Sequence, residues 1–316
     1  MKQSIPMNKN SVVILGAGPS GLSVASWLAK KGNFALTILE NQKEVGGLSR
    51  TLERQGYRFD LGPHRLSPQL PEIVEEVSRL LGPNRLSRKR HSHGVFLRDF
   101  VYHYPPRLRD YYLPSNLRTT LSFGASYLWA RAVSCARAWK TNPPQHFDEI
   151  LSSYFGRRFY RQVLAPMIVK VWGTDDLHTR FLFLRFILPT FTRMIGKLLT
   201  GNRFFPQGIF YYPREGFGQI WNKMGQVLQG QGCHLERQAV LTDIRAESLQ
   251  GPFVLRYDLP EGSREITADA LVSTIPNPSL LASLSPTRLV DPLLPLGSRF
   301  PSRVMRLLVL AVEDYR

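Results

Sequence analysis

The start of the chain changes its hydrophobic pattern at a cluster of glycines. Residues 12–15 are continuously apolar, which is typical of a buried β-strand. Apolar residues then recur at helical spacing through residues 22–29, where Leu22, Ala25 and Leu28 share one side. The pattern therefore predicts a strand, a tight turn and a helix, in that order.

The uncharged character of this region also allows two other interpretations. Residues 11–29 carry no charge and follow a short basic N-terminus, as an export signal or a membrane span would. Gly16, Gly18 and Gly21 argue against both, since each interior glycine costs a helix about 1 kcal/mol. In a nucleotide-binding unit, the first glycine permits the turn, the second lets the backbone approach a pyrophosphate, and the third packs helix against strand. We therefore expect a nucleotide-binding turn, with phosphates at the helix N-terminus.

A second β-rich run supports this interpretation. Residues 35–39 are followed by Glu40, which lies about 20 residues past the glycines. In nucleotide-binding units, an acid at this position accepts hydrogen bonds from a ribose diol. A carboxylate at this position disfavours a 2′-phosphate, so NADP is the least expected dinucleotide. On the motif alone, an ordinary βαβ loop with an incidental acid remains the alternative.

The residues after Glu40 favour FAD over NAD. Gly46 and Gly47 let the backbone pass close to a flat ligand or a phosphate, and Arg50 offers forked hydrogen bonds to phosphate oxygens. A short strand then leads into Gly62-Pro63-His64. Taken alone, His64 fits a structural turn histidine equally well.

Together these residues resemble the flavin-dependent amine oxidase and protoporphyrinogen oxidase group, which includes the FAD-containing UDP-galactopyranose mutases. The resemblance implies that FAD is the cofactor and that Gly62-Pro63-His64 lies against its isoalloxazine ring, while the other residues hold the ADP half and the pyrophosphate. The residues that it assigns to FAD are Gly16, Ala17, Gly18, Pro19, Ser20, Gly21, Glu40, Gly46, Gly47, Leu48, Arg50, Gly62, Pro63, His64 and Val240.

Later segments fit the same resemblance. Residues 147–175 are similar to a helical segment that ends in a K-V-W-G turn, and residues 266–276 to a strand that returns to the flavin domain. Residues 211–224 resemble a Y-P-x-G-G-x-x-x-L stretch, although Glu215 stands where the family often has glycine.

The substrate side is assigned less firmly than the cofactor side. Lys170, Trp172, Tyr211 and Tyr212 are the candidates, although core packing explains the three aromatic residues as well. No paired carboxylates and no Ser/His/Asp order stand out, so no catalytic residue is identified. This is expected where the cofactor carries the chemistry.

The resemblance also implies that the chain is truncated. Family members close the flavin pocket with a late A-G-D type segment, whereas residues 303–316 have the pattern of a new strand and no such segment follows. Two alternatives stay open: a fragment of a longer protein, or a short form with an incomplete flavin site.

The expected fold class is α/β, with a Rossmann-like FAD-binding domain and an inserted, mostly helical cap or substrate domain. Residues 1–70 form the first part of the FAD-binding domain, and residues 71–205 form the cap. Residues 206–280 bring return strands to the FAD-binding domain, and residues 281–316 begin a second substrate-domain sheet.

Charge adds a possible role for the surface. The chain has 41 Lys and Arg against 24 Asp and Glu, for a net charge of +17. Residues 111–147 and 177–214 contain no acid. For the second stretch three interpretations stay open: buried cap helices, a peripheral contact with an anionic membrane, or the mouth of a channel for an anionic or hydrophobic substrate. Pro189 excludes one continuous helix there.

Other partners are not indicated. The basic residues 85–94 lie in an expected loop without interleaved aromatics, so we predict no nucleic-acid binding. His91, His93 and His103 have no cysteine companion, so we predict no metal site. Cys135 and Cys233 form no close motif and suggest free thiols in a reducing, cytoplasmic compartment. The pattern leaves the oligomeric state open.

The sequence leaves three functions open. The first is an FAD-dependent oxidoreductase whose flavin accepts a hydride from a small organic substrate. The second is a sugar-nucleotide mutase in which reduced flavin attacks an anomeric carbon and arginines bind the diphosphate. The third is a non-catalytic, flavin-binding short form.

Overall fold

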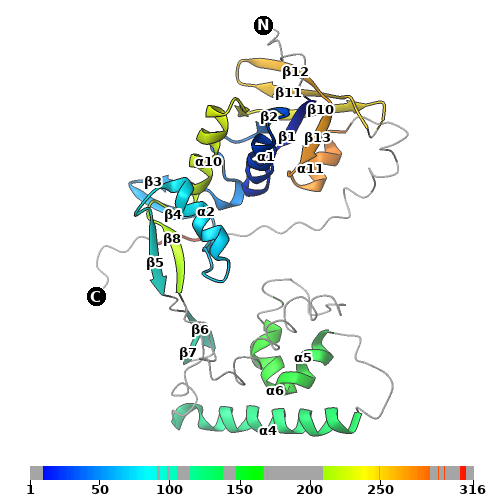
Figure 1. Cartoon of the computed structure of the whole chain (residues 1–316). Helices are drawn as coiled ribbons and strands as arrows, with labels where there is room; N and C mark the ends of the chain where they lie inside the picture. The colour runs from blue at the N-terminus through cyan, green and yellow to red at the C-terminus, as the bar shows by residue number, and fades with distance from the viewer. Residues whose placement is uncertain are drawn as a thin grey trace. The chain divides into compact units, whose positions relative to one another are not determined.

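The computed structural model describes residues 10–90, 93–97, 100–104, 114–137, 147–166, 169, 209–248, 250–284, 291, 295 and 307–310. The chain divides into two compact units, one made of residues 1–89 and 210–316 and the other of residues 90–209 (Figure 1). The fold is α/β.

A four-stranded parallel sheet is the centre of the first unit. Its strand order is β13-β1-β2-β9, so the N-terminal strand lies inside the sheet. Val12 of β1 is opposite Leu36 on one side and Ala270 on the other, in parallel register. The strands are β1 (Asn10–Leu15), β2 (Phe34–Glu40), β9 (His234–Arg237) and β13 (Ala270–Ser273).

The helix that follows β1 begins and ends where the sequence specifies. Helix α1 (Pro19–Lys31) has proline at its first turn, where the missing N–H costs no hydrogen bond. It ends before Gly32, which has the left-handed φ of 76° that glycine adopts readily. In Figure 1, α1 lies beside β1, and α10 (Gly218–Gly230) lies near it.

Successive residues of β1 serve two different cores, because side chains alternate across a strand. Val12 and Ile14 pack with Leu22 of α1 in one buried cluster. Val13 and Leu15 belong to a second cluster on the other face. Full burial of each such side chain stabilises the fold by about 1.5–3 kcal/mol.

The second cluster is completed by an antiparallel meander. Its central strand β11 buries alternate residues, Leu255, Tyr257 and Leu259, which pack in the same cluster as Val13 and Leu15. The meander covers the sheet face opposite to α1. Its strands are β10 (Val240–Ala246), β11 (Phe253–Leu259) and β12 (Gly262–Ala268), and helix α11 (Asn277–Ala282) follows β13.

A third buried cluster lies under α2 and α10. Leu66, Val77, Phe217 and Ile220 form it. The elements around it are η1 (Gly47–Ser49), the hairpin β3 (Thr51–Arg54) and β4 (Tyr57–Asp60), α2 (Pro71–Leu81), and the pair β5 (Leu86–Arg90) and β8 (Ile209–Pro213).

The expectation of a loop at residues 85–94 is wrong for residues 86–90, which form β5 beside β8, and for residues 93–94, which begin the strand β6 (His93–Leu97). For β5 the reason lies in its contacts with β8. Flanking hydrogen bonds explain the difference: Arg214 N–H donates to the Arg85 carbonyl at 2.9 Å, and Ser87 Oγ donates to the Tyr212 carbonyl at 3.0 Å. The pairing partner is too distant in sequence for a local pattern to reveal it.

The second unit contains a hairpin and a group of helices. In the hairpin, His93 is opposite Tyr104, and Gly94 is opposite His103; His91 lies outside the described residues. The elements are β6 (His93–Leu97), β7 (Phe100–Tyr104), α4 (Pro114–Arg137), α5 (Phe147–Phe155), α6 (Arg157–Phe159) and the π-helical turn η2 (Tyr160–Leu164).

The described residues contain neither a membrane-spanning helix nor a cluster of metal-binding side chains. Within them, no helix combines the length and the apolar character needed to cross a bilayer. In the same part of the chain, no group of three or more His, Cys, Asp or Glu side chains could hold a metal ion. Cys233 is a free, buried thiol, and burial raises its pKa to about 11.

The contact between Gly16 and Gly21 generates the first prediction. A Cβ atom placed on Gly21 would lie 1.9 Å from the Gly16 carbonyl oxygen. Because backbone cannot yield as a flexible side chain does, Gly21→Ala is expected to lower the free energy of unfolding by about 3 kcal/mol. Urea denaturation followed by circular dichroism measures this change.

Gly230→Ala is the matched control, since nothing lies within 4 Å of its added Cβ. This helix-terminal change should leave the free energy of unfolding unchanged or raise it by up to about 1 kcal/mol. Equal stability of the two variants would show that the β1–α1 crossing is looser than the structure indicates.

Candidate functional site

Two glycine turns face each other beside the first strand. The N–H of Gly46 donates to the Ala17 carbonyl at 2.8 Å, which joins the turn after β2 to the turn after β1. A Cβ atom on Gly47 would lie 3.2 Å from the Gly18 Cα, and one on Gly18 would lie 3.8 Å from the Gly47 Cα. Side chains at these positions would fill the gap, so the glycines leave a narrow space bounded by backbone.

The second turn requires glycine for a conformational reason as well. Gly46 and Gly47 have φ angles of 103° and 52°, in the left-handed region that other residues rarely adopt. The sequence predicted close passage of the backbone here, and the structure places it directly against the first turn.

The N-terminus of α1 lies at the first of these glycine turns. Gly18 is the N-cap residue and supplies no side-chain hydrogen bond, and the first turn contains no acid. The first N–H bonded within the helix is that of Leu22, which donates to the Gly18 carbonyl at 3.0 Å. The N–H groups of Ser20 and Gly21 thus precede the helical ladder, and they are suited to bind an anion together with the helix dipole.

Glu40, the last residue of β2, holds the turn after β1 and the turn after β2 together. Its side chain is buried, and its carboxylate accepts hydrogen bonds from Ala17 N–H at 2.7 Å and from Gln42 N–H at 2.9 Å. Each carboxylate oxygen has a further lone pair. Glu40 can therefore accept a hydrogen bond from a ribose hydroxyl in addition to these two. The sequence predicted only the ribose contact, whereas the structure adds a role in fixing the first turn.

Val240, which the resemblance assigns to the ADP half of FAD, lies next to Glu40. The N–H of Ala239 donates to the Glu40 carbonyl at 2.8 Å, which brings the start of β10 beside the end of β2. Val240 is the first residue of β10, and 52% of its surface is exposed. An exposed apolar side chain at this position is suited to cover one face of a base.

Trp221 of α10 is a site residue that the sequence did not indicate. A Cβ atom on Gly46 would lie 3.1 Å from the indole Cδ1, so the ring lies against the second glycine turn. The neighbouring Nε1 is buried and has no hydrogen-bond partner among the described atoms. Because an unpaired buried donor costs about 1–3 kcal/mol, this N–H is suited to an acceptor such as a phosphate oxygen or water. Nothing in the motif marks a tryptophan at this position.

The Gly62-Pro63-His64 turn is held against η1. His64 Nε2 lies 3.0 Å from the Leu48 carbonyl oxygen, and its ring is 5.3 Å from the ring of Phe217. The Leu48 side chain is 79% exposed, and Arg50 is half-buried at the end of η1. The structure therefore brings this turn, Leu48 and Arg50 together with the glycine pair.

Asp60 organises the elements behind this turn. Its carboxylate accepts hydrogen bonds from Thr51 Oγ1 at 2.5 Å, from the Tyr212 hydroxyl, and from Phe217 N–H at 3.2 Å. Thr51 Oγ1 in turn accepts from Gly218 N–H at 2.8 Å. One half-buried carboxylate thus joins the hairpin, β8 and the start of α10.

The four residues predicted for the substrate side have different positions. Lys170 and Trp172 lie outside the described residues. Tyr211 pairs with Leu66 through its backbone, at 2.9 and 3.0 Å, and its ring packs on the third cluster. The Tyr212 hydroxyl is bound to Asp60, and burial, followed by that hydrogen bond, raises the pKa of Tyr212 above its usual value of 10.0.

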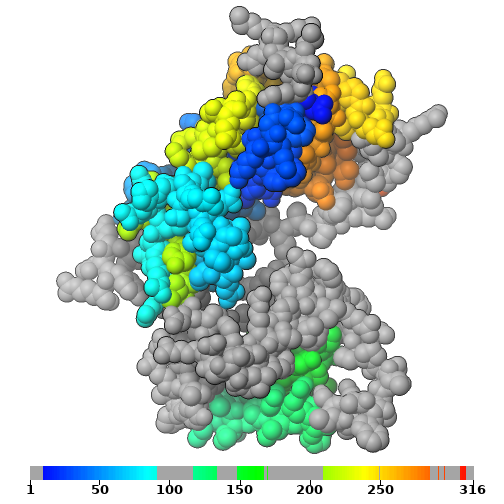
Figure 2. Space-filling model, in the orientation of Figure 1, coloured from blue at the N-terminus to red at the C-terminus, as the bar shows by residue number. Residues whose placement is uncertain are grey.

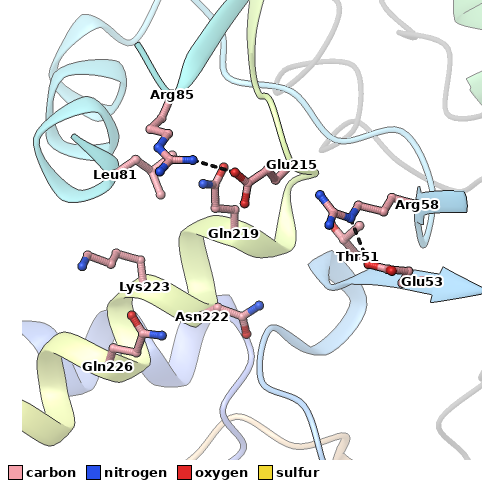
Figure 3. A pocket seen from close by; sticks show the side chains of 10 residues that line it. All are labelled: Thr51, Glu53, Arg58, Leu81, Arg85, Glu215, Gln219, Asn222, Lys223 and Gln226. Carbon is pink, nitrogen blue, oxygen red and sulfur yellow. Dashed lines mark hydrogen bonds and ion pairs between the residues drawn. The ribbon is translucent and has the colours of Figure 1, made fainter. Parts of the chain in front are cut away.

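A cavity of about 430 Å³ lies beside α10, which lines it, and includes no residue of the glycine turns (Figure 3). Arg85 meets Glu215 at 2.6 Å and Arg58 meets Glu53 at 2.9 Å, so ion pairs occupy two of its walls. Glu215, which replaces the glycine common in the resembling family, is thereby explained by its partner Arg85. The cavity is lined by Thr51, Glu53, Arg58, Leu81, Arg85, Glu215, Gln219, Asn222, Lys223 and Gln226, and none of these is a predicted cofactor residue.

Comparison with known proteins gives a family match over most of the chain. The model described as "Flavin containing amine oxidoreductase" matches residues 19–312. A phytoene desaturase of Fusarium fujikuroi is 43% identical over 74 residues, which are 23% of this chain and 12% of that protein. An L-amino-acid oxidase of Bothrops pauloensis is 39% identical over 100 residues, which are 30% of this chain and 20% of that protein. The matched part is therefore a small share of each relative.

Solved structures show the same fold over a longer stretch. A reduced UDP-galactopyranose mutase superposes with a TM-score of 0.68 at 20% identity, over 92% of this chain and 61% of that chain. A putative protoporphyrinogen oxidase from Exiguobacterium sp. 255-15 gives a TM-score of 0.60 at 18% identity, over 88% and 62% of the two chains. The chain thus spans less than two thirds of these proteins, and the likeness shows the fold.

The Asp60 contacts generate a stability prediction. Tyr212→Phe removes the hydroxyl that donates to Asp60 and leaves the ring in place. A hydrogen bond to a charged group contributes about 1.5–3 kcal/mol, so the free energy of unfolding should fall by about 2 kcal/mol. Tyr57→Phe is the control, because Tyr57 lies on β4, as Asp60 does, and is 54% exposed. This change should alter the free energy of unfolding by less than about 0.5 kcal/mol.

A double-mutant cycle separates this hydrogen bond from other effects of the ring. In an Asp60→Asn background, Tyr212→Phe should cost clearly less than it does in the parent chain. The same cost in both backgrounds would mean that the Tyr212 hydroxyl and Asp60 are not coupled.

The raised pKa of Tyr212 also predicts a pH dependence. The folded state retains the hydroxyl proton at pH values where the unfolded tyrosine, with its ordinary pKa of 10.0, releases it. Stability from this group is therefore complete below about pH 10 and is lost as the pH rises above that value. Burial also raises the pKa values of Cys233 and Tyr257, so the informative quantity is a difference between variants. Above pH 10, the free energy of unfolding should fall more steeply for the parent chain than for Tyr212→Phe, and identical slopes would contradict the assignment.

Proposed function

The chain belongs to the flavin-containing amine oxidoreductase family, and on that basis we propose that it holds FAD across its two glycine turns as an FAD-dependent oxidoreductase. The observation that carries the proposal is the 3.2 Å approach of a Gly47 Cβ position to the Gly18 Cα, beside the open N-terminus of α1. Backbone on both sides and free N–H groups at one end are suited to a pyrophosphate.

The rest of the cofactor would extend in two directions from the pyrophosphate. Glu40 and Val240 would bind the ribose and the base on one side, while Arg50 and the Trp221 indole N–H would bind phosphate oxygens. On the other side, the Gly62-Pro63-His64 turn would lie against the isoalloxazine ring. The hydrogen bond between His64 and the Leu48 carbonyl, with Phe217 behind the ring, supports a fixed surface for a flat ligand.

When bound, FAD supplies the redox chemistry, accepting a hydride from a C–N or C–C bond of a small organic substrate and passing the electrons to an acceptor. The chain's own part is to position the cofactor and to exclude water. Asp60 supports this function, because its hydrogen bonds to Thr51, Tyr212 and Phe217 fix the strand that enters the flavin-facing turn.

A sugar-nucleotide mutase is the second candidate. Its support is the net charge of +17, which favours an anionic diphosphate substrate, together with the fold shared with a UDP-galactopyranose mutase. In that function the flavin must be reduced before turnover, which separates the two candidates experimentally.

Gly18→Ala tests the cofactor site without disturbing the fold. Its added Cβ would meet the Gly47 Cα at 3.8 Å, an ordinary contact, but would occupy the space between the turns. FAD affinity, measured by titration of the apoprotein, should fall at least about tenfold, or about 1.4 kcal/mol. The free energy of unfolding should change by less than about 1 kcal/mol, because the poorer N-cap and the lower chain entropy of alanine oppose each other. Gly230→Ala, which adds a methyl group in open space, should bind FAD as the parent chain does.

The visible absorption spectrum and heat release of the chromophore identify the cofactor directly. We expect an oxidised-flavin spectrum and released FAD. A colourless chain that takes up no added FAD, or a Gly18→Ala variant that binds as tightly as the parent, would contradict the proposed site.

Anaerobic substrate tests then decide between the two reactions. Bleaching of the flavin by an amine or another reduced organic compound supports the oxidoreductase. Conversion of a UDP-sugar only after dithionite reduction, without bleaching by such donors, would transfer the assignment to the mutase.

A further inference from the structure

One side of α4 in the second unit exposes a continuous apolar surface. We define the α4 apolar face as Leu117, Leu121, Gly124, Ala125, Leu128 and Trp129, all of which are exposed. The exposed fractions of its large side chains are 45%, 64%, 67% and 74% for Leu117, Leu121, Leu128 and Trp129. Positions 117, 121, 124 and 128 recur at helical spacing and lie along one side of the helix.

The opposite side of α4 makes the packing contacts. Phe123 meets the ring of Phe159 edge-on at 5.4 Å, and Ser126 lies so close to Gly156 that an added Cβ there would meet its carbonyl carbon at 2.8 Å. Arg131 donates to the Ser153 carbonyl. Figure 1 shows α5 and α6 on one side of α4, and Figure 2 shows the helix reaching the surface of its unit. The helix is therefore anchored by one face while the leucines of the other face remain outside.

The charges of the described residues on and next to α4 are positive. Arg118 is exposed on the same helix, and Arg158 donates to Ser122 Oγ of α4 at 2.6 Å. Helix α4 itself contains no acid, and within the described residues of the second unit the acids are Asp148 and Glu149 at the start of α5.

We propose that the α4 apolar face docks on an anionic lipid surface. Exposed leucines and a tryptophan on a helix that carries an exposed arginine and no acid are the composition of a helix that lies in the membrane interface, with its apolar side in the acyl boundary and its cations at the headgroups. A second copy of the chain is disfavoured as the occupant, since the same arginines would meet across a symmetric interface.

This inference is independent of the proposed cofactor. The sequence suggested a possible membrane contact in residues 177–214, of which residues 177–208 lie outside the described residues. The present proposal concerns a helix in the acid-free residues 111–147. A substrate that is dissolved in, or borne by, a membrane would be suited to such an attachment.

Co-sedimentation with vesicles tests the docking surface, using the full chain. The parent chain should bind vesicles of phosphatidylcholine mixed with phosphatidylglycerol far better than vesicles of phosphatidylcholine alone, and added salt should weaken the binding. Leu121→Gln combined with Leu128→Gln should lower the partition coefficient by about tenfold or more. The control, Ile73→Gln combined with Val227→Gln, replaces two exposed helical apolar residues of the other unit and should bind as the parent does.

A second variant tests the charge contribution separately. Arg118→Glu changes an exposed residue and should lower binding to the anionic vesicles several-fold while leaving circular dichroism unchanged. Equal binding of the parent and the leucine variant, or equal binding to neutral and anionic vesicles, would overturn the proposal. A parent chain that binds no vesicles but self-associates through these leucines, as shown by analytical ultracentrifugation, would assign the face to a second copy instead.

Discussion

The close crossing of backbone between Gly16 and Gly21 determines the geometry of the first unit. Helix α1 reaches β1 only because position 21 has no Cβ, which would lie 1.9 Å from the Gly16 carbonyl oxygen. The crossing brings the helix N-terminus to the end of the strand, and the Gly46 N–H then joins the second turn to Ala17. The narrow space between the two glycine turns depends on this contact, because backbone of the two turns forms both sides of that space.

The second constraint is a pair of carboxylates with defined partners, the buried Glu40 and the half-buried Asp60. Glu40 accepts from Ala17 and Gln42, and Asp60 accepts from Thr51, Tyr212 and Phe217. Buried charge is costly unless it is hydrogen-bonded, so each carboxylate fixes the chain segments that satisfy it. Glu40 fixes the first glycine turn, where the pyrophosphate is proposed to lie, and Asp60 fixes the turn proposed to face the flavin.

The sequence predicted the elements whose signals are local. The strand, glycine turn and helix at residues 10–31 follow from apolar period and glycine spacing, and the resemblance to the flavin-dependent amine oxidase group is confirmed by the family match. The sequence missed β5, because its partner β8 lies more than a hundred residues away. The roles of Asp60 and Trp221 were missed for the same reason, since α10 supplies contacts that no local pattern contains. The apolar spacing along α4 was readable, but not which of its sides the neighbouring helices cover.

The alternation of β1 between two cores has a consequence for cooperativity. Val12 and Ile14 point to α1, whereas Val13 and Leu15 point to the meander, so one six-residue strand is shared by both layers. Loss of either layer would expose one face of β1 and weaken its hold on the other. The two layers should therefore melt in a single transition, and amide hydrogen exchange in the distant β11 would report on the integrity of the first glycine turn.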